Sequence, residues 1–182
     1  DKHINNVGLK YDWGVTRENK GYARIYRDYY GYDNQGEISE STIGLDVQQQ
    51  VKTSDKNKVV FGTSLYKANA YNEIAFSEGE SINNKALFVQ DEWQFAPSWQ
   101  LNAGLRYDNH SEAGSKTTAS VAMNKKFNEN SHAYLSWGQI FKAPNIDDLY
   151  YSNTTWGYYG DKNLKSETGD QWNLGYDVAT SA

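Results

Sequence analysis

Residues 99–108 read WQLNAGLRYD, and the alternation in this stretch decides the fold class. Polar residues or glycine alternate with apolar side chains. The apolar side chains occupy every second position: Trp99, Leu101, Ala103, Leu105 and Tyr107. A period of two places one set of side chains on each face of a β-strand. The stretch therefore predicts a strand with one apolar face and one polar face.

The same period recurs along the whole chain. Clear alternation covers 7–15, 43–47, 133–137 and 172–178, and weaker segments fill 21–30, 58–68, 85–95 and 116–127. No segment keeps a helical period. The sequence predicts an all-β fold, an antiparallel up-and-down meander of about nine strands. Several predicted strands reach about 10 residues, the length of strands that cross a bilayer at a tilt.

The connections between these segments alternate in length. Short turns are predicted at 16–20, 53–57, 95–99 and 127–131, and longer polar connections at 31–41, 69–84, 108–116 and 142–167. Outer-membrane barrels have short periplasmic turns, long external loops, a lipid-facing surface and aromatic residues near strand ends. This pattern favours part of a transmembrane barrel. A soluble carbohydrate-binding β-sandwich and a small closed barrel, acting as a passive pore or adhesion protein, remain alternatives.

Composition narrows the function classes. The 182 residues carry a formal net charge of -5, so the sequence predicts no basic surface for nucleic-acid binding. The chain has no cysteine, which excludes disulfides, thiolate metal sites and cysteine nucleophiles. His3, His110 and His132 lie in separate segments, and no phosphate loop or nucleophile elbow is present. We therefore expect no enzyme, no catalytic residue and no cofactor.

One pair of acids could bind a metal. The adjacent carboxylates of Asp147 and Asp148 are candidate calcium ligands, because calcium prefers oxygen donors. Adjacent carboxylates on exposed chain are more often simply solvated. We expect solvated carboxylates here and no metal site.

Binding residues are sought in the aromatic-rich connection at 142–167. Five large rings lie there in a polar setting: Tyr150, Tyr151, Trp156, Tyr158 and Tyr159. Exposed rings favour burial against something, either a ligand or neighbouring loops. On the polar face of the strand at 99–108, Arg106 and Asp108 are candidates for contact with a solute in the lumen, and their mutual pairing is the alternative.

Three stretches, in order, resemble the barrel of TonB-dependent outer-membrane receptors. They are ALFVQDEWQFAPSWQLNAGLRYDNHS (86–111), FNENSHAYLSWGQIFKAPNIDDLY (127–150), and GDKNLKSET followed by QWNLGYD (160–177). The residues that match the family's motifs are Phe141, Lys142, Ala143, Pro144, Asn163, Leu164 and Glu167. Within the family the pattern is most similar to the vitamin B12 receptors, and ferric-siderophore receptors share most of it. Asp161 and Lys162 stand where the family often has Asn-Pro.

The resemblance implies a fold and a function. Family barrels have about 22 strands around a plug, so residues 1–182 are expected to be a single partial β-barrel domain without plug domain, TonB box or C-terminal barrel strands. The implied protein binds a scarce bulky solute, cobalamin or a ferric siderophore, and imports it across the outer membrane of a Gram-negative-type bacterium. The implied partners are the TonB-ExbB-ExbD complex, acting through the plug, and outer-membrane lipid.

Overall fold

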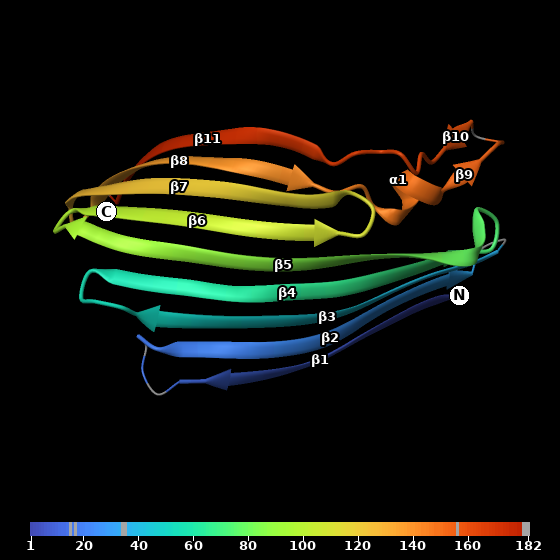
Figure 1. Cartoon of the computed structure of the whole chain (residues 1–182), viewed down its shortest axis with the longest axis horizontal. Helices are drawn as coiled ribbons and strands as arrows, with labels where there is room; N and C mark the ends of the chain where they lie inside the picture. The colour runs from blue at the N-terminus through green and yellow to red at the C-terminus, as the bar shows by residue number, and fades with distance from the viewer. Residues whose placement is uncertain (15, 17, 34–35, 156, 180–182) are drawn as a thin grey trace.

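The computed structural model describes residues 1–14, 16, 18–33, 36–155 and 157–179. Within them, nine strands form one antiparallel sheet in the order β1-β2-β3-β4-β5-β6-β7-β8-β11 (Figure 1). The strands are β1 Lys2–Trp13, β2 Lys20–Asp33, β3 Glu37–Lys52, β4 Asn57–Asn72, β5 Phe76–Ala96, β6 Trp99–His110, β7 Gly114–Asn128, β8 Ser131–Lys142 and β11 Glu167–Val178. The predicted meander is confirmed.

The two ends of the sheet differ (Figure 1). Tight turns lie at one end, where 53–56, 97–98 and 129–130 join strands as predicted. The turn predicted at 16–20 lies partly outside the described residues. The N-terminus and the connection between β8 and β11 lie at the opposite end, called here the connection end.

The prediction of a long connection is wrong at three of the four places, 31–41, 69–84 and 108–116. Pairing continues to Asp33↔Glu37 in β2–β3, to Asn72↔Phe76 in β4–β5 and to His110↔Gly114 in β6–β7. Ladder hydrogen bonds join backbone groups whatever the side chains are, so strands can continue where both faces are polar and wet. The strands therefore extend beyond their apolar stretch at the connection end. Only 143–166 is a long connection, as predicted.

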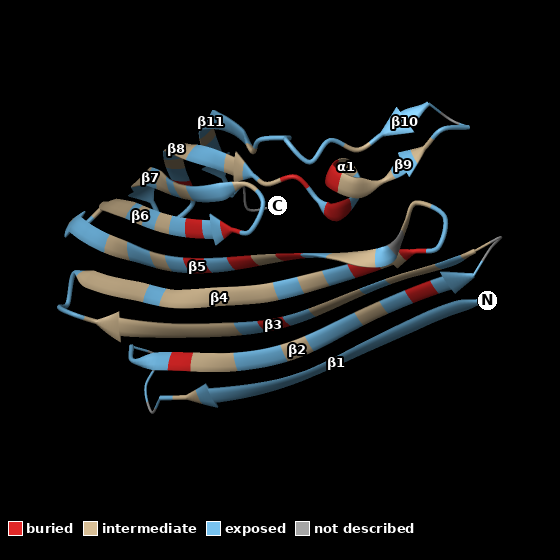
Figure 2. Cartoon of the chain, turned by 45° about the vertical axis from the view of Figure 1, so that its right-hand side comes forward, coloured by how far each residue is buried: buried red, intermediate tan, exposed pale blue. Residues whose placement is uncertain are grey.

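The register separates the sheet into two faces. The apolar face carries cross-strand rows such as Leu9↔Ile25↔Leu45↔Leu65. Leu9 is 71% exposed and Ile25 is 50% exposed, and Figure 2 shows most of the sheet as exposed or intermediate. A soluble sandwich would bury these side chains between two sheets. The described strands form one such sheet, so the sandwich alternative does not fit.

The opposite, polar face carries an ionic network. Arg24 Nη2 donates to Asp46 Oδ2 at 2.8 Å, and Ser64 Oγ donates to Asp46 Oδ1 at 2.7 Å. The guanidinium of Arg24 also lies 4.6 Å from the ring centre of Tyr26. Charges that satisfy one another in this way suit the water-filled interior of a barrel.

Aromatic residues gather at the tight-turn end of the apolar face. Phe95 lies between two tryptophans, with ring centres 5.5 Å from Trp93 and 6.1 Å from Trp99. Trp13 stacks on Tyr11 at 6.0 Å. The predicted aromatic girdle is present at this end, where amphipathic rings suit a membrane–water interface.

Candidate ligand-binding site at the connection end

The connection at 143–166 begins with a helix, α1 Ile146–Tyr150, that periodicity did not predict. Pro144 follows β8, and the side chain of Asn145 accepts a hydrogen bond from the backbone nitrogen of Asp148 at 2.8 Å. The carboxylate of Asp148 accepts one from the backbone nitrogen of Asn145 at 3.1 Å. This reciprocal capping box fixes the first turn of the helix. At five residues, α1 is the only helix in the described ranges, and none there has the length and apolar character to span a membrane.

The helix is anchored on the polar face of the sheet. Ile146 and Leu149 pack against Ala70 on β4 and Ile82 on β5, and Leu149 is only 1% exposed. Figure 2 shows buried segments in α1 and at the ends of β5 and β6 nearest to it. This small apolar cluster holds the connection against the inner wall, at the mouth of the sheet.

The returning chain closes onto the helix. Gly160 N donates to Tyr151 O at 2.6 Å, and Asp161 N donates to Asp148 O at 3.0 Å. A Cβ on Gly160 would lie 2.8 Å from the carbonyl carbon of Leu149 and the nitrogen of Tyr150, so the close approach requires glycine.

Asp161 and Lys162, two residues that depart from the family pattern, have contacts in this connection. The carboxylate of Asp161 accepts from Asn163 N at 2.8 Å and shapes the turn. The ammonium of Lys162 lies 4.6 Å from the ring centre of Tyr150 and 3.8 Å from a carboxylate oxygen of Glu80 on β5. Lys162 therefore joins the connection to the sheet by a cation–π contact and an ion pair.

The motif residues bracket the connection. Lys142, the last residue of β8, lies opposite Glu167, the first residue of β11, and Lys142 Nζ is 3.3 Å from Glu167 Oε1. Phe141 pairs with Thr168 in the same ladder, Ala143 links β8 to the buried Pro144, and Leu164 is exposed. Residues far apart in sequence thus close the base of the connection.

The structure separates the candidate rings by environment. Tyr150 is half-buried, and desolvation, followed by the charges of Glu112 and Glu80, raises the pKa of its hydroxyl. The rings of Tyr151 and Tyr158 meet edge to face at 5.4 Å, within the hairpin of β9 Ser152–Asn153 and β10 Tyr158–Tyr159. Tyr158 remains 46% exposed and Tyr159 67% exposed. Trp156 lies outside the described residues.

Arg106 and Asp108 pair with each other. Arg106 Nε lies 2.8 Å from Asp108 Oδ2, and Arg106 Nη2 lies 2.9 Å from Asp108 Oδ1. Asn84 Nδ2 also donates to Asp108 Oδ1 at 2.8 Å. The alternative considered from the sequence, mutual pairing, describes this arrangement; contact with a solute stays a prediction.

A buried polar pair beside them was not predicted. His110 Nδ1 accepts from the backbone nitrogens of Glu112 and Ala113 at 3.2 Å each, which places the ring proton on Nε2. His110 Nε2 and Asn84 Oδ1 are buried without a partner in the described part of the chain, and the two residues are opposite in the β5–β6 ladder. A donor and an acceptor therefore remain available side by side on the polar face.

The carboxylates of the two calcium candidates, Asp147 and Asp148, lie in different surroundings. The carboxylate of Asp148 serves the capping box, and Asp147 is exposed. In the described ranges, no three His, Asp or Glu side chains are grouped as metal ligands. The hydrogen bond from the backbone nitrogen of Asn145 accounts for the orientation of the Asp148 carboxylate.

Replacing Asn145 by Ala should loosen α1. Loss of the capping side chain is expected to cost the helix about 1 kcal/mol. In the full-length protein, hydrogen exchange of amides 146–151 should accelerate about fivefold. Asp147→Asn is the matched control, because the Asp147 carboxylate accepts no hydrogen bond in the described structure; equal acceleration in both variants would contradict the capping role.

The same segment should respond to pH. Partial desolvation, and then the charge of Asp148, raises the pKa of Asp147. A raised folded-state pKa means that ionisation of Asp147 opposes folding, so the contribution of Asp147 to the stability of α1 is fully present below the unfolded pKa and is lost as pH rises through the folded pKa. Asp147→Asn should flatten this dependence, measured as protease susceptibility of 143–166 between pH 4 and 7; an unchanged slope would contradict it.

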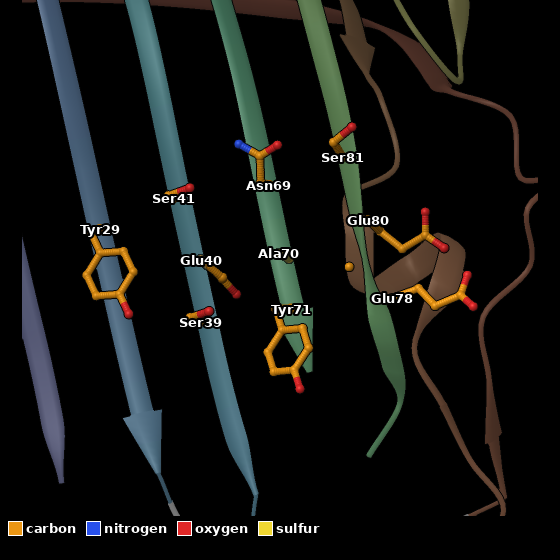
Figure 3. A pocket seen from close by; sticks show the side chains of 11 residues that line it. Tyr29, Ser39, Glu40, Ser41, Asn69, Ala70, Tyr71, Glu78, Glu80 and Ser81 are labelled. Carbon is orange, nitrogen blue, oxygen red and sulfur yellow. The ribbon is translucent and has the colours of Figure 1, made fainter. Parts of the chain in front are cut away.

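A polar pocket of about 420 Å³ lies at the connection end on the other side of the sheet. In Figure 3, Tyr29, Ser41, Asn69 and Tyr71 project from β2, β3 and β4, whereas Glu78 and Glu80 point away from them beyond β5. Tyr29, Ser41, Asn69 and Ser81 form one row of the ladder and share the face of Ile25 and Leu65. Much of the pocket lining therefore lies on the apolar face, although Ala70 and Glu80 of the lining also contact the connection.

Comparison with protein families gives one match over nearly the whole chain. Residues 2–181 match the family described as TonB dependent receptor-like, beta-barrel. Vitamin B12 transporters BtuB from three strains of Vibrio cholerae serotype O1 are 36% identical over 96 residues, which is 52% of this chain and 14% of each relative. The matched part of the chain thus spans about a seventh of the length of these curated relatives.

Solved structures share the fold at low identity. The siderophore receptor PirA from Pseudomonas aeruginosa has a TM-score of 0.89 at 19% identity, covering 99% of this chain and 36% of PirA. A mutant of the ferric enterobactin receptor PfeA from the same organism has a TM-score of 0.81 at 15% identity, covering 98% of this chain and 32% of PfeA. PirA from Acinetobacter baumannii has a TM-score of 0.78 at 14% identity, covering 98% of this chain and 33% of that protein.

Proposed function

This chain belongs to the TonB-dependent receptor-like β-barrel family, and from that premise we propose that the full protein binds a scarce, bulky solute and imports it across the outer membrane. The family is one of outer-membrane receptors and not of enzymes. The chain supplies part of the barrel wall, with lipid on its apolar face and the lumen on its polar face.

One observation carries the proposal: the connection at 143–166 is anchored at the mouth of the sheet and still exposes aromatic rings. Leu149 is buried against the inner wall, whereas Tyr159 is 67% exposed. Anchoring lowers the entropy lost when a ligand is bound, and exposed rings supply apolar contact area. Tyr158 and Tyr159 are the proposed ligand contacts, and Arg106 and Asp108 line the lumen below.

Cobalamin is the solute to test first. The sequence match to proteins named vitamin B12 transporters covers 52% of the chain at 36% identity. The structures named siderophore and ferric enterobactin receptors support the fold, and at 14–19% identity they do not discriminate between solutes. A ferric siderophore is therefore the alternative solute. In this proposal, the energy for import comes from TonB with ExbB and ExbD.

Replacing Tyr159 by Ala should weaken solute binding. Loss of a contacting ring costs roughly 1–2 kcal/mol, or about 5- to 30-fold in Kd. Calorimetry of cyanocobalamin with the full-length receptor measures this, and Tyr158→Ala should act in the same direction. Tyr71→Ala is the matched control, because Tyr71 lies on the face away from α1.

Two outcomes would count against this assignment. If cobalamin binding is unchanged in both tyrosine variants, these rings do not contact the solute and serve only to pack the connection. Uptake assays in cells that lack other receptors separate the solutes: cobalamin accumulation that requires TonB supports the first choice, and accumulation of a ferric siderophore alone supports the alternative. If neither solute accumulates, the proposed function fails for both.

A further inference from the structure

The apolar face changes chemistry in three successive rows across β2, β3, β4 and β5. The rows run in this order: Ile25–Leu45–Leu65–Lys85, then Arg27–Ile43–Lys67–Asn83, then Tyr29–Ser41–Asn69–Ser81. Residues two positions apart along a strand share a face, so all three rows point the same way. Towards the connection end the surface passes from aliphatic, through cationic, to hydroxyl and amide. A membrane passes from acyl chains to headgroups in the same order.

Three cations in these rows form no ion pair with the part of the chain that the structure describes. Arg27, Lys67 and Lys85 are exposed, and none forms an ion pair with a described residue. Several cations on the polar face are paired: Arg24 with Asp46 at 2.8 Å, Lys58 with Glu92 at 2.5 Å and Arg106 with Asp108 at 2.8 Å. On the polar face, Lys20, Lys116 and Lys126 also form no ion pair with a described residue. The three cations of these rows differ from them in lying on the apolar face, next to aliphatic side chains.

The unpaired cations are also close together. Lys67 pairs with Asn83, two residues from Lys85, so the two lysines are diagonal neighbours about 7–8 Å apart. Arg27 lies across Ile43 from Lys67, two strand spacings or about 10 Å away. Such a cluster suits an anionic group with more than one charge.

An apolar groove runs up to these cations. It has a volume of about 500 Å³, and its lining includes the aliphatic side chains of Ile25, Ile43, Leu45 and Leu65. Lys67 and Lys85 belong to the same lining. A free anion would need no aliphatic groove, and an acyl chain alone would need no cations. A phosphate-bearing lipid satisfies both parts.

We propose that this surface, the cationic groove, binds a phosphate-bearing lipid from the membrane leaflet at the connection end. The lipid phosphates lie against Arg27, Lys67 and Lys85, and an acyl chain occupies the groove. The hydroxyls and amides of the third row, seen in Figure 3, lie where the sugar or glycerol part would be. The site faces lipid and not the lumen, so it operates whichever solute is imported.

The tight-turn end of the same face supplies a natural control. Lys125 lies there, 4.5 Å from the ring centre of Trp99, and its ammonium donates to Ser98 Oγ at 2.8 Å. This cation is engaged by the protein. Lys125→Gln removes the same charge from the same face without touching the cationic groove.

Native mass spectrometry of the full-length receptor with bisphosphorylated lipid A tests the proposal. Each Lys→Gln change at 67 or 85 should weaken lipid binding about fivefold, and the double variant about 25-fold, because each cation near an anionic surface contributes similarly. Lys125→Gln should leave it unchanged. Equal binding by the double variant and the unmodified receptor, or equal loss in Lys125→Gln, would overturn the assignment.

Two further arms use the unmodified receptor, so they do not depend on a variant that assembles. Dephosphorylated lipid A should bind at least tenfold more weakly, and equal binding would reduce the site to apolar contact. Inorganic phosphate in large excess should displace little lipid A, because it cannot fill the groove. Complete displacement would identify a simple anion site and overturn the lipid assignment.

Discussion

Replacing Leu149 by Ala should detach α1 from the inner wall and cost the connection about 2–5 kcal/mol, the range for truncating a buried leucine. Leu149 is 1% exposed, and its partners Ala70 and Ile82 are fixed in the sheet, so they cannot collapse into the space that is left. The small cluster has few other apolar contacts to hold the helix. This change should therefore release the whole connection at 143–166.

Limited proteolysis of the full-length receptor measures this release. The connection in Leu149→Ala should be cleaved much faster, and the affinity for the solute should fall because Tyr158 and Tyr159 lose their anchored position. Leu164→Ala is the matched control: the same truncation in the same connection at a side chain that is 42% exposed. If both variants resist cleavage like the unmodified receptor, the anchoring role of Leu149 is wrong.

The strands and their faces were predictable because their signal is local. A period of two is legible within residues 99–108 alone, and the register then placed Leu101, Leu105 and Tyr107 on one face and Arg106 and Asp108 on the other. The extent of the strands was not predictable in the same way. Backbone hydrogen bonds between strands do not depend on side-chain polarity. Polar residues near the hairpin ends were therefore predicted as loops, although their backbone pairs with the neighbouring strand.

The candidate ligand-binding site could not be predicted in the same way, because the contacts that form it leave no periodic pattern in the sequence. A five-residue helix is too short for a helical period, although Asn145 with Asp148 three residues later is the signature of a capping box. The contact of Lys162 with Tyr150 and Glu80 requires the chain to return to β5. The pairing of Asn84 with His110 needed the β5–β6 register, because nothing in either local sequence distinguishes these residues from other polar side chains.

The cationic groove shows the same limit. Arg27, Lys67 and Lys85 lie in three different strands, and each alone is an ordinary charged residue. They become a cluster only because the register places Ile43 between Arg27 and Lys67 and brings Lys85 beside them. Local patterns therefore predicted the wall of the barrel, and the register was needed to find the sites on it.

Replacing Leu87 by Arg should prevent most of the receptor from assembling. Leu87 lies on the apolar face of β5, between Trp93 at the tight-turn end and Asn83 in the cationic row, and it is 62% exposed. In a membrane that exposure is contact with acyl chains. Arginine on the lipid-facing surface of a barrel costs up to about 2–4 kcal/mol, the value reached at the bilayer midplane.

Gln90→Arg is the matched control, because Gln90 is three residues along the same strand on the polar face, opposite Val60 and Gly104. There the guanidinium would meet water and polar side chains. Folding of the full-length receptor into phospholipid vesicles, followed by the heat-dependent shift in gel mobility, measures assembly. Leu87→Arg should fail and Gln90→Arg should succeed; the reverse result would mean that the faces are exchanged, and with them both the lumen and the proposed lipid site.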